Sequence, residues 1–168
     1  ATREVFDDDG WFHTGDIGII DEDGFLKITD RKKSLIVTSG GKNIAPAPIE
    51  LKLATSSFIE QVHVIGDKRN FLTALIVPNF DTLIAYLKNN GNNLNDPNAL
   101  VDHSDVIELF NNEVDIAMSE FSNYEKIKKF TLLTDPFSIE KGEMTPKMSI
   151  VKKVVEQNYS ELINKMYS

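Results

Sequence analysis

The chain has 168 residues, of which 41% are hydrophobic and 26% charged, enough for one domain with a packed core. Its formal net charge of -8 argues against nucleic-acid binding, because phosphates would be repelled. It has no cysteine, which excludes disulfides and thiolate metal sites, and its histidines (His13, His63 and His103) lack metal-ligand spacing. Without a membrane-length apolar run or a signal peptide, we expect a cytoplasmic protein with no metal site.

The first quarter of the chain alternates short apolar runs with glycine turns. Two runs, Ile17–Ile20 and Phe25–Ile28, flank Asp21-Glu22-Asp23-Gly24, which predicts a β-hairpin because Asp-Gly suits a tight turn. Ser34–Thr38 is β-branched and apolar, which predicts another strand. Ser39-Gly40-Gly41 must then turn, since glycine reaches positive φ without steric cost.

The middle of the chain predicts a helix, a second hairpin and a second helix. Two prolines open a helix over Ile49–Thr55, where proline is tolerated in the first turn. An alternating stretch leads to a turn at Asp67–Asn70, and the returning run Leu72–Val77 is apolar enough to be a central strand. Asp81–Asn89 reads as a helix with Asp81 as its N-cap and an Asn-Asn-Gly stop.

The last third predicts helices around one more strand. Residues 90–103 are rich in Asn and Asp, which is compatible with a loop or a short helical insertion. Ile127–Leu133 reads as a strand, and residues 135–146 as a loop. Ser104 caps a helix with apolar side chains at helical spacing: Ile107, Phe110, Val114, Ala117 and Phe121. Thr145-Pro146 begins a final helix with one apolar face: Met148, Val151, Val155, Tyr159, Leu162 and Met166.

Four features could bind a ligand, although each has a plainer interpretation. Asp16 follows Thr-Gly and could accept hydrogen bonds from a vicinal diol, or simply belong to a turn. Arg31 could donate to a hydroxyl or phosphate, or lie in a solvated charged turn. Gly40-Gly41 could admit a ligand close to the backbone, or only reverse the chain. Lys147 at a helix start opposes the helix dipole, which suggests an anionic partner, or it is an exposed lysine.

The order of these motifs is more informative than any one of them. "DGWFHTGD", "DRKKSLI" and "SGGKNIAPAPIE" resemble successive signatures of the acyl-adenylate-forming superfamily, specifically the long-chain fatty acyl-CoA synthetases, which are AMP-forming ligases. The resemblance is dense over residues 7–50 and continues more loosely through "FLTALIVPN" and "GEMTP". It implies two steps: a fatty acid and Mg-ATP give an acyl-adenylate and pyrophosphate, and the thiol of coenzyme A then displaces AMP.

The resemblance also implies a division of the chain. Residues 1–30 correspond to the terminal β-hairpin of a large N-terminal body, and residues 31–168 to a small C-terminal lid that rotates between the two steps about a hinge near 30–33. The lid is expected to be an α+β domain whose small mixed or antiparallel sheet is flanked by helices. The chain begins with Ala1 and lacks a phosphate-binding loop, so we expect a C-terminal fragment that is inactive alone.

Individual roles follow from the same resemblance. Asp16 matches the acid that holds the ribose hydroxyls of AMP, and Arg31 the arginine that contacts the same ribose. Lys33 falls at the hinge position. The loop that approaches the active site and the pantetheine tunnel in the thioester-forming step matches Ser39, Gly40, Gly41, Lys42 and Asn43.

The catalytic lysine is where this chain departs from the family. In the family, a lysine shortly after a Thr-Pro pair bridges the substrate carboxylate and the α-phosphate and offsets charge in the transition state. The aligned position here holds Ser149, while Lys147 lies just before it and Lys152 just after it. Lys147 is therefore predicted to take the role.

The resemblance names ligands and partners as well. ATP with Mg²⁺, coenzyme A and a fatty acid would be substrates of the full-length enzyme, none bound tightly by the fragment, and the N-terminal body would be its partner. Lipid substrates leave room for peripheral membrane association, although no basic amphipathic stretch indicates it. Two alternatives remain: the lid of another adenylate-forming enzyme, such as an aryl-CoA ligase or a peptide-synthetase adenylation domain, and a non-catalytic binding module.

Overall fold

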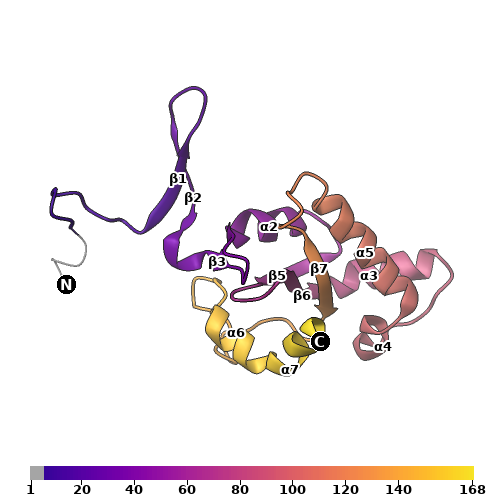
Figure 1. The fold of residues 1–168 in the computed structure, drawn as a ribbon. Coiled ribbons are helices and arrows are strands. Elements are labelled where there is room, and N and C mark those ends of the chain that lie inside the picture. Colours follow the sequence, from indigo (N-terminus) through magenta and orange to yellow (C-terminus); the bar gives the residue numbers. More distant parts are fainter. Residues whose placement is uncertain (1–5) are drawn as a thin grey trace.

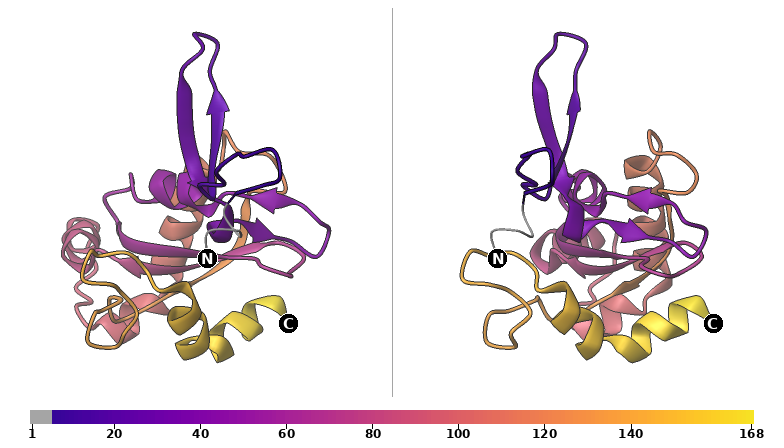
Figure 2. Two further views of the ribbon diagram at one scale, coloured as in Figure 1. Left: turned by 90° about the vertical axis from the view of Figure 1, so that its left-hand side faces the viewer. Right: turned by 60° about the vertical axis from the view of Figure 1, so that its left-hand side comes forward.

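A slender hairpin projects from a rounded α+β domain that holds the rest of the chain (Figure 1 and Figure 2). The structure is a computed structural model that describes residues 6–168, and of Thr29, Asp30 and Lys33 only the backbone. The first five residues of the predicted 1–30 segment lie outside the described residues. The predicted α+β class is confirmed, because a mixed sheet lies between two groups of helices.

The hairpin consists of β1 (Asp16–Ile20) and β2 (Leu26–Arg31), which pair antiparallel as predicted. Its turn is closed by the carboxylate of Asp21, whose Oδ1 accepts the Phe25 N–H at 2.8 Å, while Gly24 has φ +85°. Apolar side chains along the hairpin are exposed: Ile19, Ile20, Phe25, Leu26 and Ile28. The hairpin is thus tied together locally and leaves apolar surface uncovered within residues 6–168.

A short 3-10 turn and a small two-stranded sheet follow the hairpin. The turn is η1 (Lys32–Ser34), and β3 (Ile36–Val37) pairs antiparallel with β4 (Asn43–Ile44). The predicted strand Ser34–Thr38 was therefore too long. Only Ile36 and Val37 find ladder partners, so the flanking residues adopt a turn or loop conformation despite their β-branched composition.

The main sheet has the order β5 (Ile59–Ile65), β6 (Leu72–Pro78), β7 (Ile127–Leu132). The central strand β6 runs antiparallel to β5 and parallel to β7. All of its residues are buried. A strand covered on both faces needs apolar side chains at every position, which explains its continuous apolar run and confirms the predicted central strand.

Successive residues of β6 face two different cores, because side chains alternate across a strand. Ala74 and Ile76 pack in a core shared with α2 (Pro46–Leu53), α3 (Phe80–Asn89), α4 (Pro97–Val101) and α5 (Ser104–Ala117). Leu75 and Val77 pack in a second core shared with α6 (Lys152–Asn158) and α7 (Ser160–Tyr167). The helices therefore cover both faces of the sheet.

Two predicted helix starts were wrong by one or two residues. The N-cap of α3 is Asn79 rather than Asp81, since Asn79 Oδ1 accepts the Thr82 N–H at 3.1 Å. The N-cap of α5 is His103 rather than Ser104. The region 90–103, for which a loop or a short helix was predicted, contains α4.

The predicted start of the final helix was wrong. Residues 145–149 form a turn, in which Thr145 N–H donates to Ser149 O at 2.8 Å and Thr145 Oγ1 accepts the Ser149 N–H at 3.2 Å. The threonine therefore closes a turn instead of capping a helix. Met148, predicted on the apolar face, is 65% exposed and has φ +60°. The helix begins at Lys152 and is interrupted at Tyr159, which gives two short helices.

Gly66 offers a test of this packing. A Cβ at Gly66 would overlap Leu72 Cδ2 and lie 3.2 Å from Ile36 Cγ2, and the Leu72 side chain is fully buried. Gly66→Ala is expected to lower the free energy of unfolding by about 1–3 kcal/mol. Gly40→Ala, where the nearest atom is 3.9 Å away, should stay within about 0.5 kcal/mol of the parent. Urea denaturation measures both, and equal midpoints for the two variants would contradict this account of the core.

Candidate functional site

The structure brings Asp16 and Arg31 together at the base of the hairpin. They are cross-strand partners, at the first position of β1 and the last position of β2. Arg31 Nε lies 3.0 Å from Asp16 Oδ1. The Asp16 side chain is 29% exposed and that of Arg31 74%, so both are reachable from solvent. In such a pair the carboxylate can accept hydrogen bonds from the hydroxyls of a diol, and the guanidinium can donate to the oxygens of the same diol.

The Thr14-Gly15-Asp16 stretch forms the turn that positions this pair. Thr14 Oγ1 accepts the Asp16 N–H at 3.1 Å, and Gly15 O accepts the Lys32 N–H at 2.7 Å. Gly15 has φ +76°, a conformation that favours glycine. The two interpretations of this motif are therefore compatible: the tripeptide does build a turn, and the turn leaves the carboxylate partly exposed beside Arg31.

Lys33 lies in η1, the short turn between the end of the hairpin and β3. The chain enters this turn directly from β2, since Arg31 is both the last residue of the strand and the N-cap of the turn. The Arg31 side chain makes no capping hydrogen bond to this turn, and the Lys32 N–H at its start donates instead to Gly15 O at 2.7 Å. The hinge role of Lys33 stays a prediction.

Ser39–Lys42 turn the chain between β3 and β4, as predicted for Ser39-Gly40-Gly41, and Asn43 begins β4. Gly41 has φ +74°, and its N–H donates to Thr38 O at 2.9 Å. Ser39 Oγ donates to Asn70 Oδ1 at 2.6 Å, so the turn is braced against the turn that joins β5 to β6. Gly40, Gly41 and Lys42 are exposed, which leaves their backbone open to a ligand.

Lys147 lies in the turn before α6, not at the start of a helix. The helix-dipole argument for an anionic partner therefore does not apply to it. Lys147 and Ser149, the residue at the aligned lysine position, are both exposed. The turn has φ +60° at Met148 and is closed by a bridge between Met144 and Ile150.

Sequence reasoning missed the carboxylate behind this turn. Glu143 is only 1% exposed, and its oxygens accept the Ser138 N–H at 3.3 Å and Asn158 Nδ2–H at 3.0 Å. Its main-chain oxygen accepts the Val151 N–H at 2.8 Å. Glu143 therefore joins the loop, the turn and α6. A glutamate inside a polar loop carries no sequence signal of burial, because burial depends on helices that approach it from elsewhere.

The predicted site residues are spread over different sides of the domain. In the left-hand view of Figure 2, the β3–β4 turn and the loop leading into α6 lie at opposite sides, with the hairpin above them.

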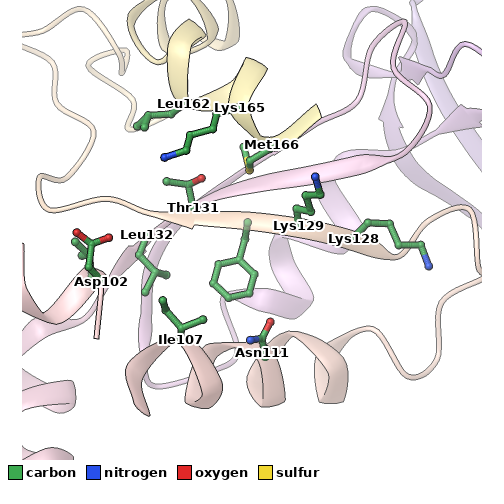
Figure 3. Close-up of a pocket in the computed structure, with 12 residues that line it drawn as sticks. Asp102, Ile107, Asn111, Lys128, Lys129, Thr131, Leu132, Leu162, Lys165 and Met166 are labelled. Atoms are coloured by element: carbon green, nitrogen blue, oxygen red, sulfur yellow. The ribbon is translucent and has the colours of Figure 1, made fainter. Parts of the chain in front are cut away.

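A hollow in the described residues lies away from all of these features. It has a volume of about 480 Å³ and lies between α5, β7 and α7. Figure 3 shows Ile107 and Asn111 from α5 on one side, and Leu162 and Lys165 from α7 on the other. None of the predicted site residues lines it. The candidate site is thus made of surface turns and a surface ion pair.

Across residues 6–168, no group of three His, Cys, Asp or Glu side chains is placed to hold a metal ion. None of the helices described there is long and apolar enough to cross a bilayer.

Comparison with known sequences identifies related proteins. Residues 33–168 match the family described as AMP-binding enzyme C-terminal domain. The whole chain is similar to the long-chain-fatty-acid–CoA ligase FadD15 of Mycobacterium tuberculosis, at 40% identity over 172 residues that make up 28% of that ligase. It is similar to the long-chain-fatty-acid–CoA ligase ACSBG2 of Gallus gallus at 34% identity, with 99% of this chain and 24% of that ligase covered.

Solved structures share the fold. The adenylation domain of carboxylic acid reductase from Segniliparus rugosus, in complex with AMP and a co-purified carboxylic acid, superimposes with a TM-score of 0.79 and 27% identity. That match covers 99% of this chain and 24% of the other. A fatty acyl CoA synthetase of Mycobacterium tuberculosis matches with a TM-score of 0.54 and 27% identity, covering 96% and 26%. The chain thus spans about a quarter of the proteins it resembles.

Proposed function

The chain belongs to the AMP-binding enzyme C-terminal domain family, and from this we propose that it is the C-terminal part of a long-chain fatty acid–CoA ligase. The full-length enzyme would convert a fatty acid, ATP and coenzyme A into acyl-CoA, AMP and pyrophosphate through an acyl-adenylate. Family membership and homology to fatty-acid–CoA ligases support this assignment.

One geometric observation carries the proposal. Asp16 and Arg31 belong to two separate motifs, yet they are paired at 3.0 Å on an open surface. In the proposal, Asp16 accepts hydrogen bonds from the ribose hydroxyls of the nucleotide, and Arg31 donates to the same sugar. The pair would exchange part of its mutual contact for the ribose, which costs little because an exposed ion pair contributes only about 0–1 kcal/mol.

In this proposal, the two parts of the chain belong to two different bodies of the enzyme. Residues 1–30 would belong to the large N-terminal body, whose surface would cover the exposed apolar side chains of the hairpin. Residues 31–168 would form the lid, with the hinge at 30–33. The placement of the two turns on opposite sides of the domain supports a rotation that presents the Lys147 turn for adenylation and the Ser39–Asn43 turn for thioester formation.

The phosphates and their Mg²⁺ would be held mainly by the N-terminal body. Mg²⁺ would arrive with ATP and polarise its phosphoryl oxygens. The part of this chain that the structure describes would supply the ribose contacts and a lysine near the α-phosphate. ATP, coenzyme A and the fatty acid would bind where the lid meets the body, so we expect the 168 residues alone to bind none of them tightly.

An assay of the full-length protein against the isolated 168 residues tests the proposal. The full-length protein should form acyl-CoA and AMP from a long-chain fatty acid, ATP and coenzyme A, and the 168 residues should form none. An aryl acid serves as the competing substrate and a carrier-bound pantetheine as the competing thiol. Preference for either competitor would point to another adenylate-forming enzyme, and acyl-CoA formation by the 168 residues would refute the lid assignment.

A further inference from the structure

A buried histidine lies between two carboxylates from different helices. The side chain of His63, on β5, is 1% exposed. Its Nδ1 lies 3.4 Å from Glu50 Oε1 on α2, and its Nε2 lies 3.5 Å from Glu156 Oε1 on α6. With an acceptor near each ring nitrogen, the imidazolium is favoured, because both nitrogens then carry protons. This Glu50–His63–Glu156 cluster connects α6 to the sheet and to α2.

The charges around the cluster support that protonation state. Burial by itself would lower the pKa of His63, but the two nearby carboxylates, Glu156 and Glu50, outweigh it and raise the pKa above its ordinary value of 6.5. Burial would likewise raise the pKa of Glu50, but His63, the Val64 N–H and the charge of Lys152 lower it below 4.5. The groups that face the cluster are thus Glu50 from α2, and Glu156 and Lys152 from α6.

Lys152 extends the cluster to the segment proposed as the hinge. It is the first residue of α6, where the helix dipole disfavours a cation. Its Nζ donates to the main-chain oxygen of Ser34 at 2.9 Å, across 118 positions of sequence. Ser34 is the last residue of η1, and the carbonyls at a helix end lack partners within the helix. The lysine supplies that partner.

Helix α6 is also hydrogen-bonded to Glu143, which lies just before the turn that contains Lys147. The Val151 N–H, directly before α6, donates to Glu143 O, and Asn158 at the end of α6 donates to the Glu143 carboxylate. The turn at 145–149 is therefore attached to α6 at both ends of the helix. Through Lys152, the end of the hinge and the Lys147 turn belong to one unit.

We propose that Lys152 is a positioning residue: carried by α6, the helix whose Glu156 lies in the Glu50–His63–Glu156 cluster, it fixes the end of the hinge at Ser34 and so sets the position of the Lys147 turn in the adenylation step. Rotation of the lid then takes place before Ser34. This inference rests on the proposed function, because the hinge and the two-step reaction come from it.

Hydrogen exchange in the full-length protein tests whether Lys152 holds the end of the hinge at Ser34. Lys152→Met keeps the length of the side chain and removes its donors, Lys152→Arg keeps a cation, and Lys153→Met is the matched control at an exposed neighbour. Lys152→Met should raise exchange in residues 31–37 by about tenfold and leave β6 unchanged. Lys152→Arg should restore protection at least partly, and Lys153→Met should match the parent. Unchanged exchange at 31–37, or an equal rise in β6, would overturn the inference.

Steady-state kinetics of the full-length enzyme test whether Lys152 positions the Lys147 turn for adenylation. Lys152→Met should lower kcat for adenylation by about tenfold with KM for ATP little changed, because the Lys147 turn is displaced while Asp16, in the hairpin, stays in place. Lys152→Arg should recover most of the rate. A change in KM with kcat unchanged, or no recovery in Lys152→Arg, would contradict it. If the parent protein shows no ligase activity, the proposed function fails, but the exchange experiment still decides whether Lys152 holds the hinge.

The stabilisation that the Glu50–His63–Glu156 cluster provides should change with pH in a defined direction. The raised pKa of His63 gives stabilisation that is complete below pH 6.5 and lost as pH rises through the folded-state pKa. The lowered pKa of Glu50 gives stabilisation that is present above pH 4.5 and lost as pH falls through its folded-state pKa. Protection of residues 31–37, corrected for intrinsic exchange, should therefore fall above pH 6.5. Glu156→Gln should move this loss to lower pH, and identical profiles for the parent and Glu156→Gln would contradict the role of the cluster.

Discussion

Replacing Asp16 with alanine in the full-length enzyme is expected to lower kcat/KM for ATP by about 10²- to 10⁴-fold. The carboxylate is proposed to accept two hydrogen bonds from the ribose. Hydrogen bonds to a charged group contribute about 1.5–3 kcal/mol each, and each ~1.4 kcal/mol is a tenfold change in rate. Adenylation measured by pyrophosphate release at varied ATP concentration gives the value.

Thermal stability separates a ligand-binding role from a structural one. The contact between Asp16 and Arg31 is an exposed ion pair, and such pairs contribute about 0–1 kcal/mol. Asp16→Ala should therefore leave Tm within a few degrees of the parent. Asp23→Ala, which removes an exposed acid at the tip of the same hairpin, is the matched control and should keep full activity. A large drop in Tm with an unchanged kcat/KM would show that Asp16 serves only the hairpin.

Replacing Lys147 with alanine in the full-length enzyme should slow the adenylation step about 10²- to 10³-fold and leave the thioester-forming step nearly unchanged. The ammonium is proposed to offset charge that develops between the substrate carboxylate and the α-phosphate, and loss of one such donor costs about 10²- to 10³-fold in kcat. Thioester formation from supplied acyl-adenylate should remain within about threefold of the parent, because that step would use the opposite side of the lid. Separate assays of the two partial reactions measure the difference.

Ser149, which stands where the family has its catalytic lysine, allows a rescue experiment for the Lys147→Ala variant. Ser149 is exposed in the same turn as Lys147, so a longer side chain can be placed there without loss of core packing. The double variant Lys147→Ala with Ser149→Lys should recover part of the adenylation rate, whereas Lys147→Ala with Lys153→Ala should recover none. Normal adenylation in Lys147→Ala would show that Lys147 is not the catalytic lysine.

Elements with a strong local pattern were predicted well. The returning run Leu72–Val77 became the central strand, since only a strand buried on both faces calls for apolar residues at every position. The hairpin at Ile17–Ile20 and Phe25–Ile28 formed because its turn is closed by residues within it. The hairpin depends mainly on interactions between neighbouring residues, whereas β6 pairs with the distant strand β7 and was recognisable only because its residue types are apolar throughout.

The predicted start of the final helix was wrong because Thr145 and Pro146 suit a turn as well as the first turn of a helix. Thr145-Pro146 fits a helix start by its residue types, yet a turn forms there. Glu143, buried against α6, draws the Val151 N–H to its own main-chain oxygen, and helical geometry begins only after that bond. The competing contact comes from the fold and cannot be read from helix propensity.

The functional residues likewise fall into two groups: those that the sequence reveals and those that only the fold reveals. The motifs containing Asp16, Arg31, the glycine turn and the Thr-Pro pair are visible as residue types in order, and they were sufficient to indicate the family. The cluster around His63 was not visible: the sequence shows a histidine in an apolar strand, with Glu50 and Glu156 far from it along the chain. A buried cation and its carboxylates are recognisable only when α2 and α6 close over β5.

By itself, the sequence determined the family, the α+β class, the central strand and the identity of the residues proposed to hold the nucleotide, because these depend on residue types and on periodicity along the chain. Only the tertiary structure decided that Asp16 and Arg31 are paired, that the two turns face opposite sides and that Lys152 holds Ser34. The Asp16–Arg31 pair depends on the register of the hairpin, which residue types alone do not fix. The contact between Lys152 and Ser34 spans 118 positions and depends on how α6 packs on the sheet, which no local pattern specifies.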